Sequence, residues 1–319
     1  MFTRRSATTG IDVGLRTAML VRTESTGSEP LVTHWGIERF PESDGSAAAT
    51  SEALSRLLKR LGLKPRDLGR VATAAGGTLA VVRQAGLPPL DLPDLKQALP
   101  YEARKHLPLD NIKKPGLECQ VLPETALSET DRAEGKLPVL LAALPQTERA
   151  YLLESLAGCG VEPDVMDIHP LPEVNAMLAA HTPSVTDPVA LGVLSLTDRA
   201  QAVAVVYPGG ELYTRTLEQN GNPTLSEAGI QHLIRQIGDT LRFLNTKNRT
   251  YPVREFFLCG WDAADEGLRE IVATAIGVPM NLPAPFRGMR LQPPAPEPSE
   301  GSLLAAAVGL SQWWREADV

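Results

Sequence analysis

The stretch Gly10-Ile11-Asp12-Val13-Gly14 is the segment from which the fold of this chain can be worked out. It predicts a short buried strand, a tight glycine turn and a strand that runs back beside the first. Glycine lets a backbone approach a phosphate closely, and an Asp at a strand end can hold a metal ion through its water shell. The same five residues also suit a hairpin of any function, so further context is needed.

Composition indicates a folded, acidic protein. The chain has 319 residues, 43% of them hydrophobic, with a net charge of −7. That length predicts two or more domains, and the negative charge argues against nucleic acid as a partner. A local basic group (Arg104, Lys105, Lys113 and Lys114) is interpreted as a solvated face or a contact patch. No signal-peptide pattern and no run of about 18 apolar residues occurs, which favours a soluble cytoplasmic protein without a membrane span.

Cysteine and histidine usage argues against a metal centre. The cysteines, Cys119, Cys159 and Cys259, are odd in number and lack a Cys-x-x-Cys spacing. They suit a reducing compartment and are interpreted as buried structural thiols. The five histidines show no metal-ligand spacing, so we predict no metal site and assign no catalytic residue.

The first 76 residues predict half of a ribonuclease-H-like domain. Apolar runs and turn signals indicate, in order, strands at Thr9–Val13, Ala18–Thr23 and Leu31–Arg39, a helix at Ala47–Leu61 and a strand at Val71–Ala75. A similar order recurs later, with strands at Val189–Leu196, Ala200–Val206 and Leu212–Thr216, a helix at Leu225–Asn245 and a strand at Glu255–Cys259. This duplication predicts a cleft between two lobes, where ligands commonly bind.

The block between the two halves predicts an inserted α+β subdomain. Its expected elements include a helix from Leu95 to His106, capped by Asp94 and interrupted or kinked at Pro100. The polar stretch Ser128–Gly135 predicts a loop, Thr182–Pro188 a linker, and Pro293–Ser299 an exposed proline-rich segment before a terminal helix at Leu303–Trp314.

With this order established, the chain resembles the type IV pilus assembly protein PilM family. The matching segments are Val82-Arg83 followed by Leu87-Pro88, LPYEARKHLPLD at Leu99–Asp110, Cys119-Gln120-Val121-Leu122, and LLAAAVGL at Leu303–Leu310. The resemblance implies an α/β, actin-like (ribonuclease-H-like) fold with duplicated βββαβα lobes and an inserted α+β subdomain. The expected division is 1–76 with 165–182 as the first lobe, 77–164 as the insert and 183–319 as the second lobe.

The resemblance also implies a partner. PilM-like proteins are cytoplasmic and bind the N-terminal tail of the inner-membrane protein PilN in a groove between the first subdomain and the insert. Members often carry ATP in the central cleft. An extended tail needs an open strand edge or an apolar trough. The candidate residues for it are Val82, Arg83, Leu99, Tyr101, Glu102 and Lys105. The alternative that Leu99 and Tyr101 are ordinary core of the insert stays open.

The nucleotide site departs from the family pattern. Leu15 and Met19 replace the expected hydroxyl residue and lysine, and the second-half Asp-x-Gly element is Ser195-Leu196-Thr197. Gly260 is followed by Trp261-Asp262, and Gln236 replaces an acidic residue. The vestigial positions are Asp12, Gly14, Thr17, Ser195, Thr197 and Gly260. Losing two or three charge-assisted contacts costs roughly 10²-fold in affinity, so we predict weak or absent binding of ATP and magnesium, and a turn-capping role for Asp12.

The sequence therefore predicts a scaffold of a type IV pilus or related secretion machine, which binds a PilN-like tail and other assembly or motor proteins. Two rivals remain at this stage. One is an active actin-like ATPase of the same machinery. The other is a soluble relative of the type II secretion L protein, a family that normally continues into a membrane helix.

Overall fold

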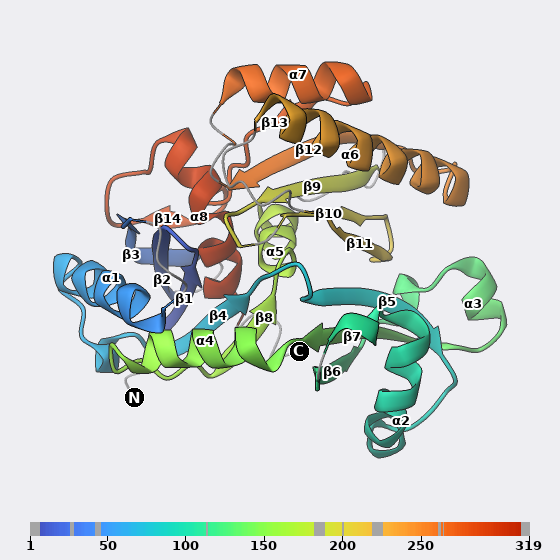
Figure 1. Cartoon of the computed structure of the whole chain (residues 1–319), viewed down its shortest axis with the longest axis horizontal. Helices are drawn as coiled ribbons and strands as arrows, with labels where there is room; N and C mark the ends of the chain where they lie inside the picture. Colours follow the sequence, from blue (N-terminus) through green and yellow to red (C-terminus); the bar gives the residue numbers. More distant parts are fainter. Residues whose placement is uncertain are drawn as a thin grey trace.

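The predicted hairpin forms the centre of a six-stranded sheet (Figure 1). The computed structural model describes residues 7–25, 29–41, 46–112, 114–181, 189–199, 201–218, 226–260, 263 and 265–313. The strand order is β14-β3-β2-β1-β4-β8. The strands are β1 Ala7–Val13, β2 Thr17–Ser25, β3 Pro30–Arg39, β4 Arg70–Ala75, β8 Val165–Ile168 and β14 Arg290–Leu291. β1 pairs antiparallel with β2 and parallel with β4, which places Asp12 at the end of an inner strand.

The second sheet repeats this plan with five strands in the order β11-β10-β9-β12-β13. They are β9 Ala190–Leu196, β10 Gln201–Val206, β11 Leu212–Thr216, β12 Val253–Gly260 and β13 Met280–Asn281. β9 pairs antiparallel with β10 and parallel with β12, as β1 does with β2 and β4. β9 is therefore the second-lobe counterpart of β1.

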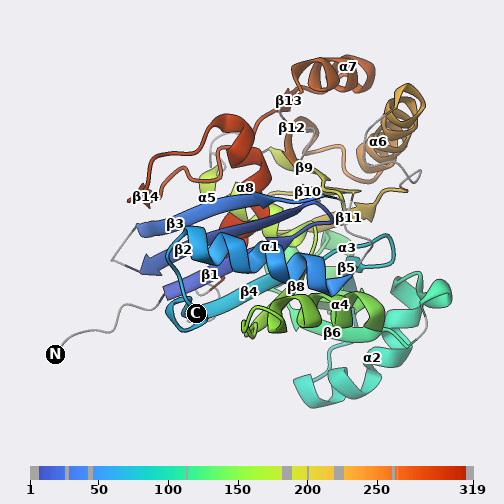
Figure 2. The same ribbon diagram turned by 60° about the vertical axis from the view of Figure 1, so that its left-hand side comes forward.

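Helices cover the outer face of each sheet. The helices α1 (Ala47–Arg60) and α4 (Gln146–Ala157) pack on the first sheet, because alternate β1 side chains, Ile11 and Val13, join their apolar core. The helices α6 (Glu227–Lys247) and α7 (Glu266–Ile276) share a core with the second sheet. Figures 1 and 2 show these two pairs on opposite sides of the molecule.

Two further helices lie between the sheets. The helices α5 (Leu171–Ala180) and α8 (Pro298–Ser311) share one core with the inner faces of both sheets. The spacing is close: a Cβ on Gly10 would lie 2.1 Å from the carbonyl oxygen of Ala307, and one on Gly309 would lie 1.8 Å from that of Pro172. Gly10 of the opening motif therefore permits close packing of α8 on β1.

The insert is a three-stranded antiparallel sheet with helices against it. Its strands are β5 Val81–Leu87, β6 Gly116–Val121 and β7 Leu137–Leu144, in the order β5-β7-β6. The helix α2 (Leu92–His106) packs on one face through an apolar cluster that includes Leu95, Leu99 and Ala103. The insert also contains the short helix α3 (Glu129–Ala133) and the 3₁₀ turns Leu109–Asn111 and Glu124–Ala126, whereas the 3₁₀ turn Pro65–Asp67 precedes β4 in the first lobe.

Several local expectations change in the structure. The N-cap of α2 is Asp91, which accepts from the Asp94 N–H, so this helix begins earlier than predicted and continues through Pro100. The segment expected as the loop Ser128–Gly135 contains α3, because the Ser128 side chain caps it by accepting from the Asp131 N–H. Pro298 is the first residue of α8, where a proline at the start of a helix loses no hydrogen bond.

The C-terminal part of the expected second lobe contacts the first lobe as well. Strand β14 pairs with β3 of the first sheet, and α8 packs on β1, β2 and β4. The expected linker Thr182–Pro188 lies outside the described residues. Within the described part of the chain, no helix combines the length and apolarity that crossing a bilayer requires.

The close contact at Gly309 gives a stability prediction. We expect Gly309→Ala to lower the free energy of unfolding by about 1–3 kcal/mol or more, because a methyl group there overlaps the α5 backbone. Gly238→Ala on α6 is the matched control, since a Cβ at Gly238 would have no atom within 4 Å, and the helix gains about 0.5–1 kcal/mol. Urea denaturation measures both. Equal effects of the two variants would contradict the close-packing argument.

Candidate functional site

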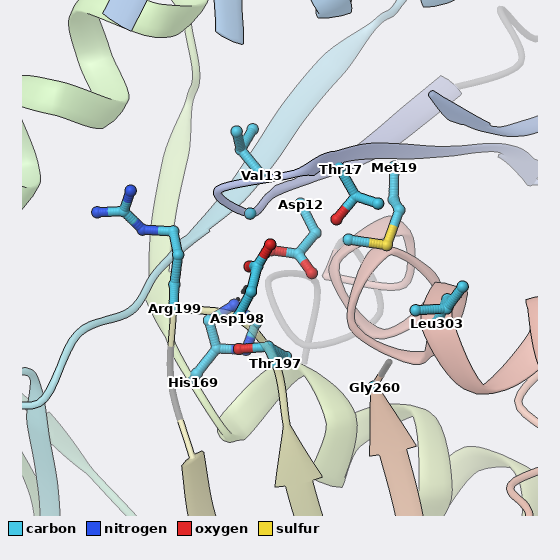
Figure 3. Close-up of a pocket in the computed structure, with 11 residues that line it drawn as sticks. Asp12, Val13, Thr17, Met19, His169, Thr197, Asp198, Arg199, Gly260 and Leu303 are labelled. Atoms are coloured by element: carbon cyan, nitrogen blue, oxygen red, sulfur yellow. Dashed lines mark hydrogen bonds and ion pairs between the residues drawn. The ribbon is translucent and has the colours of Figure 1, made fainter. Parts of the chain in front are cut away.

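The turn after β1 and the turn after β9 meet at the central cleft, where residues of both lobes line one small pocket (Figure 3). Asp12 lies near the end of β1, and Ser195 lies at the matching position of β9. Both side chains point to the inner face of their sheet, toward the start of α5. The structure therefore brings together two predicted positions that are 183 residues apart in sequence.

A buried polar chain connects these positions through two residues that sequence reasoning did not single out. His169 Nε2 lies 3.1 Å from Asp12 Oδ1, and His169 Nδ1 lies 2.8 Å from Glu173 Oε1. The Ser195 hydroxyl donates to the same Glu173 oxygen at 2.7 Å. Asp12 therefore binds a histidine rather than capping a turn, which corrects the sequence expectation. The sequence feature that could have identified His169 and Glu173 is their i,i+4 spacing at the start of a predicted helix.

The buried chain carries a positive charge between two carboxylates. Burial lowers the pKa of His169, but the charges of Glu173 and Asp12 outweigh burial and hold this pKa well above its ordinary value. Burial raises the pKa of Glu173, but the His169 charge and hydrogen bonds outweigh it and the pKa is lowered. His169 is therefore an imidazolium held by ion pairs, which is unsuited to accept a proton as a general base.

The other glycine of the opening motif lies under a carboxylate of the second lobe. The backbone N–H of Arg16 donates to Asp198 Oδ2 at 2.9 Å. A Cβ on Gly14 would lie 2.2 Å from Asp198 Oδ1. Gly14 is thus needed for a close approach, as predicted for a phosphate-binding turn, but the group that approaches is Asp198.

The described residues leave little space in the cleft. Its cavity has a volume of about 10 Å³, and its lining includes Thr17, Met19, Thr197, Gly260 and Leu303. A volume of that size holds about one water molecule, whereas ligand pockets measure roughly 300–1,000 Å³. The carboxylates of Asp12 and Glu173 are paired with His169, and that of Asp198 accepts from the Arg16 N–H, so all three are engaged with groups of the protein rather than with a metal ion. The residues present therefore do not fit ATP with magnesium.

Other predicted cleft positions have structural partners. A Cβ on Gly260, which has a φ of 113°, would lie 2.1 Å from the carbonyl oxygen of Leu196. Gln236 accepts from the Glu218 N–H and donates to the Glu218 carbonyl oxygen. Trp261 and Asp262 lie outside the described residues. Among the residues that are described, no cluster of His, Cys, Asp and Glu side chains could hold a metal ion.

A larger cavity lies between the insert and the first lobe. It has a volume of about 490 Å³ and is called the groove below. Most of its lining residues come from β6, β7 and β8, and the others come from β5, α4, the start of α5 and Trp313. The lining is mainly apolar and comprises Val82, Gly116, Leu117, Glu118, Cys119, Gln120, Leu140, Ala142, Leu144, Gln146, Arg149, Val165, Met166, Asp167, Ile168, Leu171 and Trp313.

The groove runs between two edge strands, because β6 ends the insert sheet and β8 ends the first sheet. The Leu122 N–H donates to the carbonyl oxygen of Pro138. Given the register of the β6–β7 pair, this bond shows which residues of β6 direct their backbone groups toward β7. By alternation, the backbone N–H and C=O groups of Leu117, Cys119 and Val121 point away from β7. The Cys119 N–H also donates to Glu118 Oε1 at 3.2 Å, an exposed contact that a peptide carbonyl would replace. An extended peptide can pair with these groups.

The opposite edge of the insert sheet is covered. The Thr216 hydroxyl donates to the carbonyl oxygen of Ala80 at 3.3 Å, and the Thr214 hydroxyl donates to that of Val82. The Leu212 N–H donates to the Gln84 side chain at 2.7 Å. Strand β11 of the second lobe therefore lies along β5, so β5 does not offer the open edge that the sequence suggested.

The six residues predicted for partner binding divide between the two faces of the insert. Val82 lines the groove. The next residue, Arg83, faces the other side, where it donates to the carbonyl oxygen of His106 at 2.8 Å. On that side Leu99 is buried in the insert core, Tyr101 is 71% exposed, and Glu102 pairs with Lys105 at 2.7 Å.

Two details concern other predictions. Trp313 packs against Ala72, Ala74 and Leu310 and also lines the groove. Trp314 lies outside the described residues. Of the cysteines, Cys259 is buried as expected, whereas Cys119 and Cys159 are half-buried.

A second large cavity, of about 530 Å³, lies between the insert and the β10–β11 turn. Its lining is mostly polar and includes Ser128, Arg132, Glu211, Lys247 and Asn248. Lys247 is paired with Glu211 at 3.1 Å. This cavity lacks the apolar lining and the strand edge that the groove has.

Comparisons with known proteins support the architecture. No protein-family model and no curated protein sequence matches the chain. The solved structure of a "PilM-PilN type IV pilus biogenesis complex" matches with a TM-score of 0.76 and 20% identity, over 97% of this chain and 99% of that chain. A Bacteroides thetaiotaomicron protein "with actin-like ATPase fold and unknown function" matches with a TM-score of 0.52 and 10% identity, over 96% of both chains. The predicted actin-like fold is confirmed, and the PilM–PilN structure shares it over nearly the whole chain.

The ion pairs of His169 give a prediction about its protonation. We expect the imidazole to remain protonated at pH 7.5 in nitrogen-15 NMR spectra, because its pKa is raised. His106 is the internal control, since burial lowers its pKa and leaves it neutral at that pH. The stability that His169 contributes is complete below its unfolded pKa of about 6.5 and is lost as the pH rises through the folded pKa.

The same pairs predict a stability change. His169→Gln leaves two buried carboxylates without their cation and should lower the free energy of unfolding by about 3–5 kcal/mol. His106→Gln, at a half-buried position, should change the free energy of unfolding by about 0.5 kcal/mol or less.

In the NMR experiment described above, a His169 resonance that titrates near pH 6.5 would rule out the ion-paired state.

Proposed function

We propose that this protein is a cytoplasmic scaffold of a type IV pilus or related secretion machine, and that it binds the N-terminal tail of a PilN-like inner-membrane protein. The observation that carries the proposal is the groove, an apolar channel between the edge strands β6 and β8. The PilM–PilN complex, which by its name joins such a pair, supports the choice of partner because its fold matches nearly the whole chain.

The groove suits an extended peptide for two physical reasons. The outward N–H and C=O groups of Leu117, Cys119 and Val121 can pair with a peptide backbone, which gives affinity independent of sequence. Side chains such as Leu140, Ala142 and Met166 form the apolar surface that alternate peptide side chains would cover. A volume of about 490 Å³ accommodates several such side chains.

The central cleft supports a role without nucleotide chemistry. Its cavity is small, with a volume of about 10 Å³. The His169 ion pairs and the Asp198 carboxylate also fill positions beside the β1–β2 turn. We therefore infer that protein contacts carry the function and that the cleft has a structural role. The protein would reach the inner membrane through its partner.

Strand pairing in the groove predicts the effect of a proline on β6. Cys119→Pro removes one outward N–H while leaving the β6–β7 hydrogen bonds in place, because proline is tolerated at such edge positions. We expect the Kd of a synthetic peptide, copied from the cytoplasmic tail of the PilN-like protein of the same organism, to rise about tenfold in fluorescence anisotropy. A thermal melt verifies that the variant is folded.

Two variants control this experiment. Cys119→Ala keeps the backbone N–H and should bind the peptide nearly as well as the wild-type chain. Tyr101→Ala changes an exposed side chain on the opposite face of the insert and also tests the surface predicted from the sequence. If Tyr101→Ala weakens binding and Cys119→Pro does not, the tail binds on α2 and the groove proposal is wrong.

The geometry of the cleft predicts the outcome of a nucleotide titration. We expect no saturable binding of fluorescent ATP with magnesium at micromolar concentrations and no phosphate release, with or without the tail peptide. The active-ATPase alternative requires the opposite result. Low-micromolar affinity for ATP would refute this part of the proposal.

A further inference from the structure

The β1–β2 turn of the first lobe has a carboxylate of the second lobe seated on it. The Arg16 N–H donates to Asp198 Oδ2 at 2.9 Å, and the neighbouring Leu15 N–H acts on the same carboxylate by lowering its pKa. The carboxylate lies against the Cα of Gly14, since a Cβ there would be 2.2 Å from Oδ1. These contacts join residues 182 positions apart, across the mouth of the cleft.

Two consecutive backbone N–H groups that converge on one oxygen-bearing group form a binding site for an oxyanion. Carboxylate and phosphate oxygens accept hydrogen bonds from such a site in the same way. In this chain the donors are already satisfied by Asp198. The phosphate-binding hairpin expected from the sequence therefore has an occupant of its own.

The residue after Asp198 attaches the β9–β10 turn, which carries both residues, to helix α4. Arg199 forms an ion pair with Glu148 of α4, and its guanidinium carbon lies 4.2 Å from the centre of the Tyr151 ring. Figure 3 shows the Arg199 side chain pointing away from Asp12 and Asp198. The β9–β10 turn is thus anchored both on the β1–β2 turn and on the helix layer outside the first sheet.

The surroundings of the Asp198 carboxylate explain why it needs hydrogen-bond donors. Burial raises the pKa of Asp198, and the nearby Asp12 charge adds to that effect, while the N–H groups of Leu15 and Arg16 and the Arg199 charge oppose it. A carboxylate in such surroundings needs its donors, because an unpaired buried charge is costly. The two N–H groups supply that compensation, as they would for a bound anion.

We propose that Asp198 is a built-in ligand that occupies the oxyanion site of the β1–β2 turn and ties the second lobe to the first in place of a nucleotide phosphate, with Arg199 as its positioning residue. The tie exists without any bound molecule. It follows that the wild-type chain takes no small oxyanion at this turn and that removing the carboxylate uncovers the site. This proposal does not depend on tail binding in the groove.

Amide hydrogen exchange of the full chain, followed by NMR, tests the proposal at its own atoms. In the wild-type chain the amides of Leu15 and Arg16 should exchange slowly, and millimolar inorganic pyrophosphate should not change their rates. In Asp198→Ala we expect both rates to rise at least about tenfold, because the donors lose their acceptor. Pyrophosphate should then slow them again.

Two further variants keep the test decisive. Asp198→Asn retains one acceptor oxygen at the same size and should exchange at intermediate rates, which covers the case in which Asp198→Ala fails to fold. Asp239→Ala removes an exposed carboxylate from α6 and should leave both amides unchanged. Slow amides in Asp198→Ala or Asp198→Asn, or a pyrophosphate effect on the wild-type chain, would overturn the proposal.

Discussion

The close packing of two helices between two sheets is the constraint on which the rest of this structure depends. Each sheet has an inner face that must be buried, and α5 and α8 bury both at once. The layer can be this thin because Gly10 and Gly309 place no side chain where α8 meets β1 and α5. Both lobes therefore share one core, and the ends of β1 and β9 are held at a short distance from each other and from the start of α5.

This proximity explains the chemistry of the cleft. The matched positions Asp12 and Ser195 lie at opposite ends of a polar chain whose middle members, His169 and Glu173, come from α5 and the residues just before it. A buried imidazolium between two carboxylates satisfies polar groups that would otherwise be costly to bury. With Asp198 on the neighbouring turn, the contacts across the cleft are made by the chain itself. An actin-like fold is thereby compatible with the docking role proposed above.

The insert shows how contacts with one lobe leave a surface free for another partner. Because β11 covers β5, the insert sheet has its remaining edge at β6, which faces the edge strand β8 across the groove. Trp313, two residues after the end of α8, forms part of the groove lining and also packs on the first sheet. The groove therefore adjoins the helix that lies between the lobes, and a bound peptide would contact the same structural unit that holds the lobes together.

The sequence by itself determined the element order, the duplication and the insert, because hydrophobic periodicity and turn residues act over a few positions. The hairpin at Gly10–Gly14, the meander of the second lobe and the terminal small-residue helix were all recognisable in this way. Only the tertiary structure decided what the motif residues do. Whether Gly14 faces a phosphate or Asp198, whether Asp12 caps a turn or binds His169, and which edge of the insert sheet stays open depend on contacts between residues far apart in sequence. Local patterns carry no record of such contacts, since they arise when separately formed elements pack together.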